Sequence, residues 1–154
     1  LGKLFPLAFG GLAFSAGVAA IVNGNLVLRF GMHRLTRRAL YVIASLSWLI
    51  LLLGWLGEGQ PPLWQFMGVF VFWFFCIGVV FGNINAMAME TLGHVAGSAA
   101  AVIGTLTTLM AVGLGWVIGN AYDGTILPMA IGFAVLTTIS ALLTAVVEAP
   151  AHGH

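Results

Sequence analysis

Long runs of apolar residues, separated by short polar stretches, dominate the pattern along this chain of 154 residues. Five runs are long enough for a helix to cross a bilayer core about 30 Å thick, which takes roughly 20 residues. We expect these spans to cover residues 4–28, 39–56, 63–89, 95–119 and 126–147. The runs lack the alternation of barrel strands, and backbone groups in lipid must be satisfied within helices. The pattern therefore predicts an all-α, polytopic membrane bundle of five transmembrane helices in a single membrane domain.

The composition supports this class and excludes others. Hydrophobic residues make up 61% of the chain and charged residues only 6%. A soluble domain has about 25% charged residues, so this chain cannot cover a globule with a surface that suits water. The net charge of +1 is too small to indicate a nucleic-acid partner, and the single cysteine, Cys76, excludes an internal disulfide.

Basic residues are concentrated in the first polar connection, which predicts the direction of the spans. Four of the five basic side chains lie there: Arg29, Arg34, Arg37 and Arg38. The connections after the second and fourth spans hold one acid each, Glu58 and Asp123, and no basic residue. Because basic residues favour the cytoplasmic side, we expect the arginine-rich loop 29–38 and the C-terminus inside a cytoplasmic (inner) membrane, and residue 1 on its outer side. An odd number of spans with an outside start predicts that further spans precede residue 1.

Polar side chains gather toward the end of the third span. Asn83 and Asn85 are expected to face other helices or a cavity, because lipid offers no hydrogen-bond partner. They lie about 200° apart around a helix, so they cannot both face one cavity squarely. Either an interhelical hydrogen bond or a place in a substrate cavity fits each of them, and Asn83 is the better cavity candidate because it shares a face with Glu90. Trp73 belongs to an aromatic stretch. Such a stretch suits contacts with other helices, or the wall of a cavity that binds lipophilic cations.

Glu90 ends the third span, on the side of the membrane that also holds the arginines. Three interpretations remain open for it: a solvated end residue, a gating ion pair with Arg29 or Arg34, or a proton carrier. A carboxylate at a helix C-terminus is destabilised by the negative end of the helix macrodipole. An ion pair with a nearby arginine would offset this repulsion. Gly31 permits the tight reversal between the first two helices.

Small residues recur at intervals of four, a spacing that lets membrane helices approach closely. The stripes on the third and fourth spans include Gly78, Gly82, Gly97, Ala111, Gly115 and Gly119. Static packing and the sliding of smooth helix faces are both compatible with them.

No pattern in the chain indicates an enzyme. Histidine and cysteine do not occur at metal-ligand spacing, so no metal site is expected. A nucleophile–base pair and a phosphate-binding loop are also absent from the sequence, and we expect no cofactor.

Two stretches resemble the C-terminal half of the major facilitator superfamily: "RFGMHR" after the first span, and "NINAMAMETLGHVAGSAAAVIGTL" across the third and fourth. The likeness is greatest to drug/proton antiporters of the bicyclomycin-resistance type, where an Asn-rich stretch leads into small residues, here "AGSAAA" at 96–101. The first connection keeps Gly24, Arg29, Gly31 and Arg34 of the family's signature loop, but Leu28 replaces its acid. The resemblance covers nearly the whole chain and implies helices eight to twelve of a twelve-helix fold.

The resemblance implies part of a secondary active transporter that exports small amphipathic compounds, coupled to protons, by alternating access. Its partners would be the lipid bilayer, a small-molecule substrate, protons, and a missing N-terminal half that carries the coupling acids. Glu90 would then supply the carboxylate of the cytoplasmic gate. The other interpretation that stays open is a non-transporting membrane subunit of transporter-derived fold, packed against a larger membrane complex.

Overall fold

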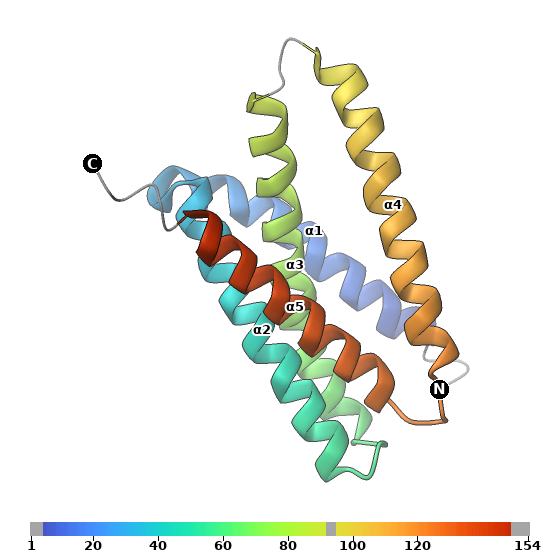
Figure 1. Cartoon of the computed structure of the whole chain (residues 1–154). Coiled ribbons are helices and arrows are strands. Elements are labelled where there is room, and N and C mark those ends of the chain that lie inside the picture. The colour runs from blue at the N-terminus through green and yellow to red at the C-terminus, as the bar shows by residue number, and fades with distance from the viewer. Residues whose placement is uncertain (1–4, 92–94, 149–154) are drawn as a thin grey trace.

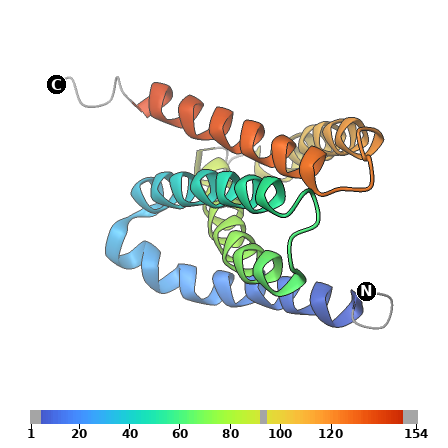
Figure 2. The same cartoon turned by 90° about the horizontal axis from the view of Figure 1, so that it is seen from below.

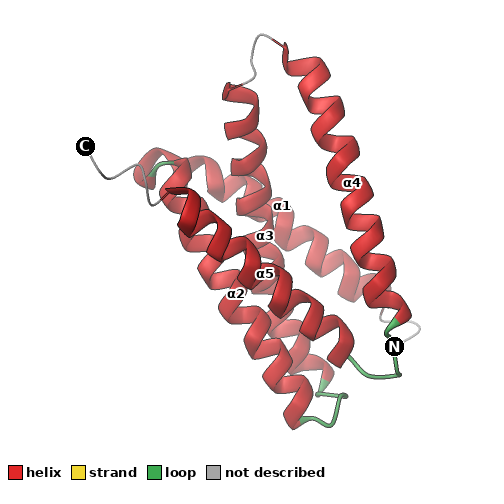
Figure 3. Cartoon of the chain, viewed as in Figure 1, coloured by secondary structure: helices red, strands yellow, loops and turns green. Residues whose placement is uncertain are grey.

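The computed structural model describes residues 5–91 and 95–148, and within them all regular structure is helical (Figure 3). The helices are α1 (Phe5–Phe30), α2 (Met32–Leu56), α3 (Leu63–Thr91), α4 (Ala96–Asn120) and α5 (Leu127–Glu148). Each of these five helices is long and apolar enough to cross a membrane. The expectation of an all-helical bundle is confirmed for the part of the chain that the structure describes, and its five helices have the length and apolar composition expected of membrane spans.

The connection between α1 and α2 differs from the expected loop. Residues 29–38 were expected to form it, but α1 continues to Phe30 and α2 begins at Met32, so Gly31 alone joins them. Its φ of 76° and ψ of 150° produce the reversal, and this positive φ favours glycine. The helix starts seven residues before Ala39 because arginine is a good helix former, and a helix can extend beyond the hydrocarbon into the headgroup region.

Helix α3 is the centre of the arrangement. It packs along α1 on one side and along α2 on the other, while α2 also packs along α5 (Figures 1 and 2). Helices α1 and α2 diverge from Gly31 and make little contact with each other (Figure 2). Helix α4 touches α3 and α5 only lightly, and no residue of its apolar span is buried within the chain.

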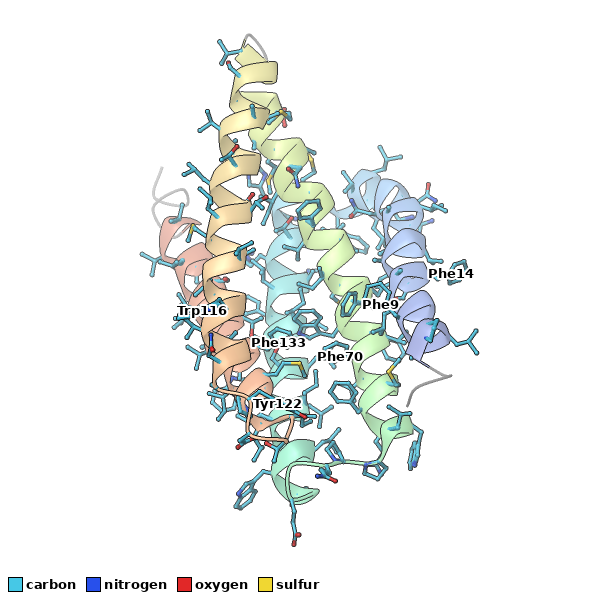
Figure 4. All side chains as sticks on the ribbon, turned by 90° about the vertical axis from the view of Figure 1, so that its right-hand side faces the viewer. Phe9, Phe14, Phe70, Trp116, Tyr122 and Phe133 are labelled. Atoms are coloured by element: carbon cyan, nitrogen blue, oxygen red, sulfur yellow. The ribbon has the colours of Figure 1, made fainter. Side chains whose placement is uncertain are left out.

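One face of α2 forms much of the core. Its buried residues recur every three or four positions, which is the spacing of a single helix face; they are Thr36, Leu40, Ile43, Ser47, Ile50 and Gly54. This face meets an aromatic cluster in which Trp73 of α3 stacks on Phe133 of α5, with ring centroids 4.8 Å apart. Phe70 stacks on the same tryptophan at 5.5 Å, and Figure 4 shows Phe70 and Phe133 side by side in the bundle. Aromatic stacking therefore joins α3 to α5, and the buried face of α2 packs against this stack.

The contact between α1 and α3 depends on small residues. A Cβ atom at Gly78 would lie 2.9 Å from the carbonyl oxygen of Ala16 and 2.9 Å from the Cβ of Ala19. Ala19 itself is fully buried. The backbones can approach this closely only because position 78 has no side chain.

The connections 57–62 and 121–126 dock against each other at one end of the bundle. The amide of Ile126 donates to the carbonyl of Gly59 at 3.0 Å, and Gly59 has a φ of 83°. In the second connection, the Asp123 carboxylate accepts hydrogen bonds from the hydroxyl of Thr125 at 2.6 Å and from its amide at 3.0 Å. The Thr125 hydroxyl in turn accepts from the amide of Leu127, which starts α5.

Replacing Gly78 with valine should destabilise the bundle, because the added atoms meet the α1 backbone at 2.9 Å. Overpacking of this kind costs about 1–3 kcal/mol. The matched control is Gly115→Val in α4, where a Cβ would meet nothing within 4 Å. Thermal unfolding in detergent should show a clear loss for Gly78→Val and at most a small change for Gly115→Val; equal losses would contradict the close α1–α3 contact.

Acidification should loosen the 121–126 connection. The hydrogen bonds from the Thr125 side chain and then from its amide lower the pKa of Asp123 below the ordinary value of an aspartate. The turn's contribution to stability is therefore complete above the unfolded-state pKa and is lost as the pH falls through the lower, folded-state pKa. An NMR titration should give a higher pKa for Asp123 in Thr125→Val than in the parent protein, and an unchanged pKa would show that the hydrogen bond from the Thr125 hydroxyl does not form in solution.

Candidate functional site

A groove of about 710 Å³ lies between α3 and α4. Its α3 wall is mostly aliphatic and aromatic, with Phe81, Ile84 and Asn85 among its residues. The α4 wall is built from smaller side chains, including Gly104, Thr107 and Thr108. The groove exists because α4 touches α3 so lightly, and both of its walls are helices long and apolar enough to cross a membrane.

A few polar groups interrupt this apolar lining. Asn85 donates its Nδ2 to the carbonyl of Phe81 in its own helix at 2.8 Å, and its Oδ1 accepts no hydrogen bond from the residues that the structure describes. The Thr107 hydroxyl donates to the carbonyl of Ile103 at 2.8 Å, again within its own helix. None of the residues that line the groove is ionisable. Chemically, the groove can accept a largely apolar molecule and offer an amide oxygen to a hydrogen-bond donor.

The two asparagines of α3 face different neighbours, as their 200° separation predicts. Asn85 lines the groove, whereas Asn83 lies between α3 and α1, 1% exposed, and does not line it. The Nδ2 of Asn23 in α1 donates to the Oδ1 of Asn83 at 2.7 Å. The sequence left two roles open for Asn83, an interhelical hydrogen bond and a place in a cavity. In the structure, Asn83 forms the interhelical hydrogen bond.

Sequence reasoning missed Asn23 as the partner of Asn83. The signal was the polar group "NGN" at residues 23–25, which lies inside both the expected span 4–28 and helix α1. The pair is incompletely satisfied: the Oδ1 of Asn23 and the Nδ2 of Asn83 are buried without a partner among the described residues. Gly82 lies beside it, since a Cβ there would be 3.6 Å from the Nδ2 of Asn23.

Trp73 lies in the core and not in the groove. It is 8% exposed, and its Nε1 donates to the hydroxyl of Ser47 in α2 at 2.8 Å. That hydroxyl donates to the carbonyl of Ile43, so the indole is part of a buried, satisfied chain of hydrogen bonds. This geometry places Trp73 in helix packing, one of the two roles that the aromatic stretch suggested.

The three charged residues of the expected gate lie apart. Arg29 is in the last turn of α1, Arg34 is in the first turn of α2, and Glu90 is near the end of α3; all three are exposed. No ion pair joins Glu90 to either arginine within the described residues, and the end of α3 is separate from the α1–α2 link in Figures 1 and 2. The gate therefore stays a prediction.

The small residues on the expected packing stripes divide into two groups. Gly78 and Gly82 face α1, but Gly97, Gly115 and Gly119 of α4 have open space where a Cβ would be, and Ala111 lines the groove. Gly132 of α5 was not among the expected packing residues, yet a Cβ there would lie 2.6 Å from the Cδ1 of Ile118. Helix α4 thus meets α5 at a glycine of α5 and leaves its own glycines uncovered.

Among the described residues, no group of three or more histidine, cysteine or acidic side chains could hold a metal ion.

Comparison of the chain with models of protein families, with curated proteins and with solved structures finds no match.

Replacing Asn83 with leucine should weaken the α1–α3 contact, because it removes the hydrogen bond and leaves Asn23 buried without a partner. A double-mutant cycle of Asn23→Leu and Asn83→Leu should give a coupling energy of about 0.5–2 kcal/mol, the range of hydrogen bonds between membrane helices. Unfolding in mixed detergent micelles measures it. Asn85→Leu, whose amide bonds only its own helix, is the control and should change stability by less than about 0.5 kcal/mol. A coupling energy near zero would show that the two amides act independently.

Proposed function

We propose that this chain is part of a secondary active transporter that moves small amphipathic compounds across a membrane by alternating access. The observation that carries the proposal is the α3–α4 groove. Its volume of about 710 Å³ lies within the range of about 300–1,000 Å³ typical of small-molecule sites. A groove with an apolar lining and a few polar atoms, between two membrane-spanning helices, suits a substrate that is mostly apolar and has one or two polar groups.

The unequal attachment of the helices supports a moving wall. Helix α3 is held by α1 and α2 along its length, through Gly78 and the Asn23–Asn83 hydrogen bond on one side and through the core on the other. Helix α4 has light contacts only, and its glycines have open space where a Cβ would lie. In the proposed cycle, α3 is the fixed wall of the passage and α4 is the side that faces a second half of the transporter, because alternating access requires two halves around a central site.

Proton coupling, in this proposal, depends on carboxylates outside this chain. The lining of the groove has no ionisable side chain, and Glu90 is exposed at the end of α3. The chain would therefore contribute the binding surface, and the other half would contribute the proton site, as in the antiporters that the sequence resembles. The arginine-rich residues 29–38 would face the cytoplasm, according to the distribution of basic residues.

A second candidate function has its own support. The uncovered glycines of α4 suit docking against another membrane protein, which is what a non-transporting subunit would require. The two functions differ in what a blocked groove does: it stops a transporter, but it leaves a docking subunit in place in its complex.

Filling the groove should stop transport. Gly104→Trp places an indole in the groove, where a Cβ would meet nothing within 4 Å, so the bundle should still fold. Gly113→Trp is the matched control, since it has the same open space on the opposite face of α4, nine residues or about 180° away. In cells that produce the protein, efflux of a neutral, lipophilic fluorescent dye should fall several-fold for Gly104→Trp and stay near the parent rate for Gly113→Trp.

Equal efflux rates in the parent and both variants would contradict the proposed passage. If, in addition, Gly113→Trp released the protein from a larger membrane complex while Gly104→Trp did not, the subunit function would replace the transporter function. Membrane quantities of each variant must be matched before rates are compared.

A further inference from the structure

The α1–α2 link concentrates positive charge. Arg29 is in the last turn of α1, and Arg34 and Arg38 lie four residues apart on one face of α2. All three are exposed, and no ion pair connects them to a carboxylate within the described residues. The guanidinium of Arg38 lies over the ring of Phe30, 5.7 Å from its centroid, so α2 directs this charge back toward the end of α1.

The backbone at the start of α2 adds to the positive potential. Gly31 occupies the cap position and has no side chain to accept hydrogen bonds from the first amides of the helix. These amides lack intrahelical partners and form the positive end of the helix macrodipole. Arginines at this end of a helix are unfavourable on their own, and an anion bound among them would relieve both the dipole and the mutual repulsion.

A hollow on the surface of α1 leads up to this charge. Its volume is about 360 Å³, and its lining consists of Val22, Asn25, Leu26, Leu28 and Arg29. Val22, Leu26 and Arg29 are spaced by four and three residues and share one face of the helix. Along the helix, the aliphatic side chains of Val22 and Leu26 lie within the span, with the amide of Asn25 between them, and the guanidinium of Arg29 lies at its end. A phospholipid has the same order of chemistry, from acyl chain to phosphate.

We infer that this hollow and the arginines around Gly31 form a binding site for an anionic phospholipid. Arg29, Arg38 and the first amides of α2 bind the phosphate, and an acyl chain lies along Val22 and Leu26. The charge of the cluster favours an anionic headgroup over a zwitterionic one, and the aliphatic part of the lining favours a lipid over a soluble phosphate. The inference does not depend on the proposed transport function or on the direction of the spans.

Native mass spectrometry tests the site directly. The protein is released from nanodiscs that contain equal amounts of phosphatidylglycerol and phosphatidylcholine with identical acyl chains, and the bound lipids are counted. The parent protein should retain phosphatidylglycerol preferentially, and the preference should fall roughly fivefold for each of Arg29→Gln and Arg38→Gln, because one arginine near an anionic lipid contributes about that factor. The paired variant R29K/R38K keeps the charge and should keep most of the preference.

Three outcomes would overturn the inference. The first is equal retention of the two lipids by the parent protein. The second is an unchanged preference in R29Q/R38Q, with helical content by circular dichroism equal to that of the parent. The third is displacement of phosphatidylglycerol by millimolar inorganic phosphate, which would show a site for soluble anions instead of a lipid site.

Discussion

The structure depends on the requirement that backbone groups in hydrocarbon find their hydrogen bonds within helices. Once the five helices have formed, hydrophobic burial does little to join them, because the lipid acyl chains are as apolar as a leucine side chain. Close packing and a few polar contacts must do so instead. Helix α3 shows both: Gly78 lets it approach Ala16 and Ala19 of α1, and Asn83 bonds to Asn23 of the same helix. On its other side, the Trp73–Ser47 hydrogen bond and the stack of Trp73 on Phe133 hold it to α2 and α5.

Helix α4 is the exception to this rule, and the candidate site follows from that. It shares one close glycine contact with α5, at Gly132, and leaves the α3 side as a groove. Side chains such as Trp116, which is 70% exposed, point away from the bundle (Figure 4). A helix with so few contacts inside its own chain suits either a moving wall or a surface for another protein. The groove, with Asn85 in its lining, is the reason to prefer the moving wall.

The spans could be predicted from the sequence because length and apolar composition determine them almost alone. The start of α2 could not, since Arg34, Arg37 and Arg38 carry the pattern of a loop, although arginine is compatible with a helix in the headgroup region. The opposite directions of Asn83 and Asn85 followed from helical geometry. Which of them would line a groove did not follow, because that depends on where α1 and α4 lie. Asn23 and Gly132 were missed for the same reason: their roles exist only relative to a partner helix.

The most direct test of the account is whether the groove side of α4 and its opposite side experience different surroundings in a membrane. Spin labels at position 104 or position 113, in a Cys76→Ala background reconstituted into liposomes, report their accessibility to a polar relaxation agent and to oxygen. We expect the label at position 104 to be the more accessible to the polar agent and the label at position 113 to be the more accessible to oxygen. Two labels that both respond as in plain hydrocarbon would contradict a passage between α3 and α4.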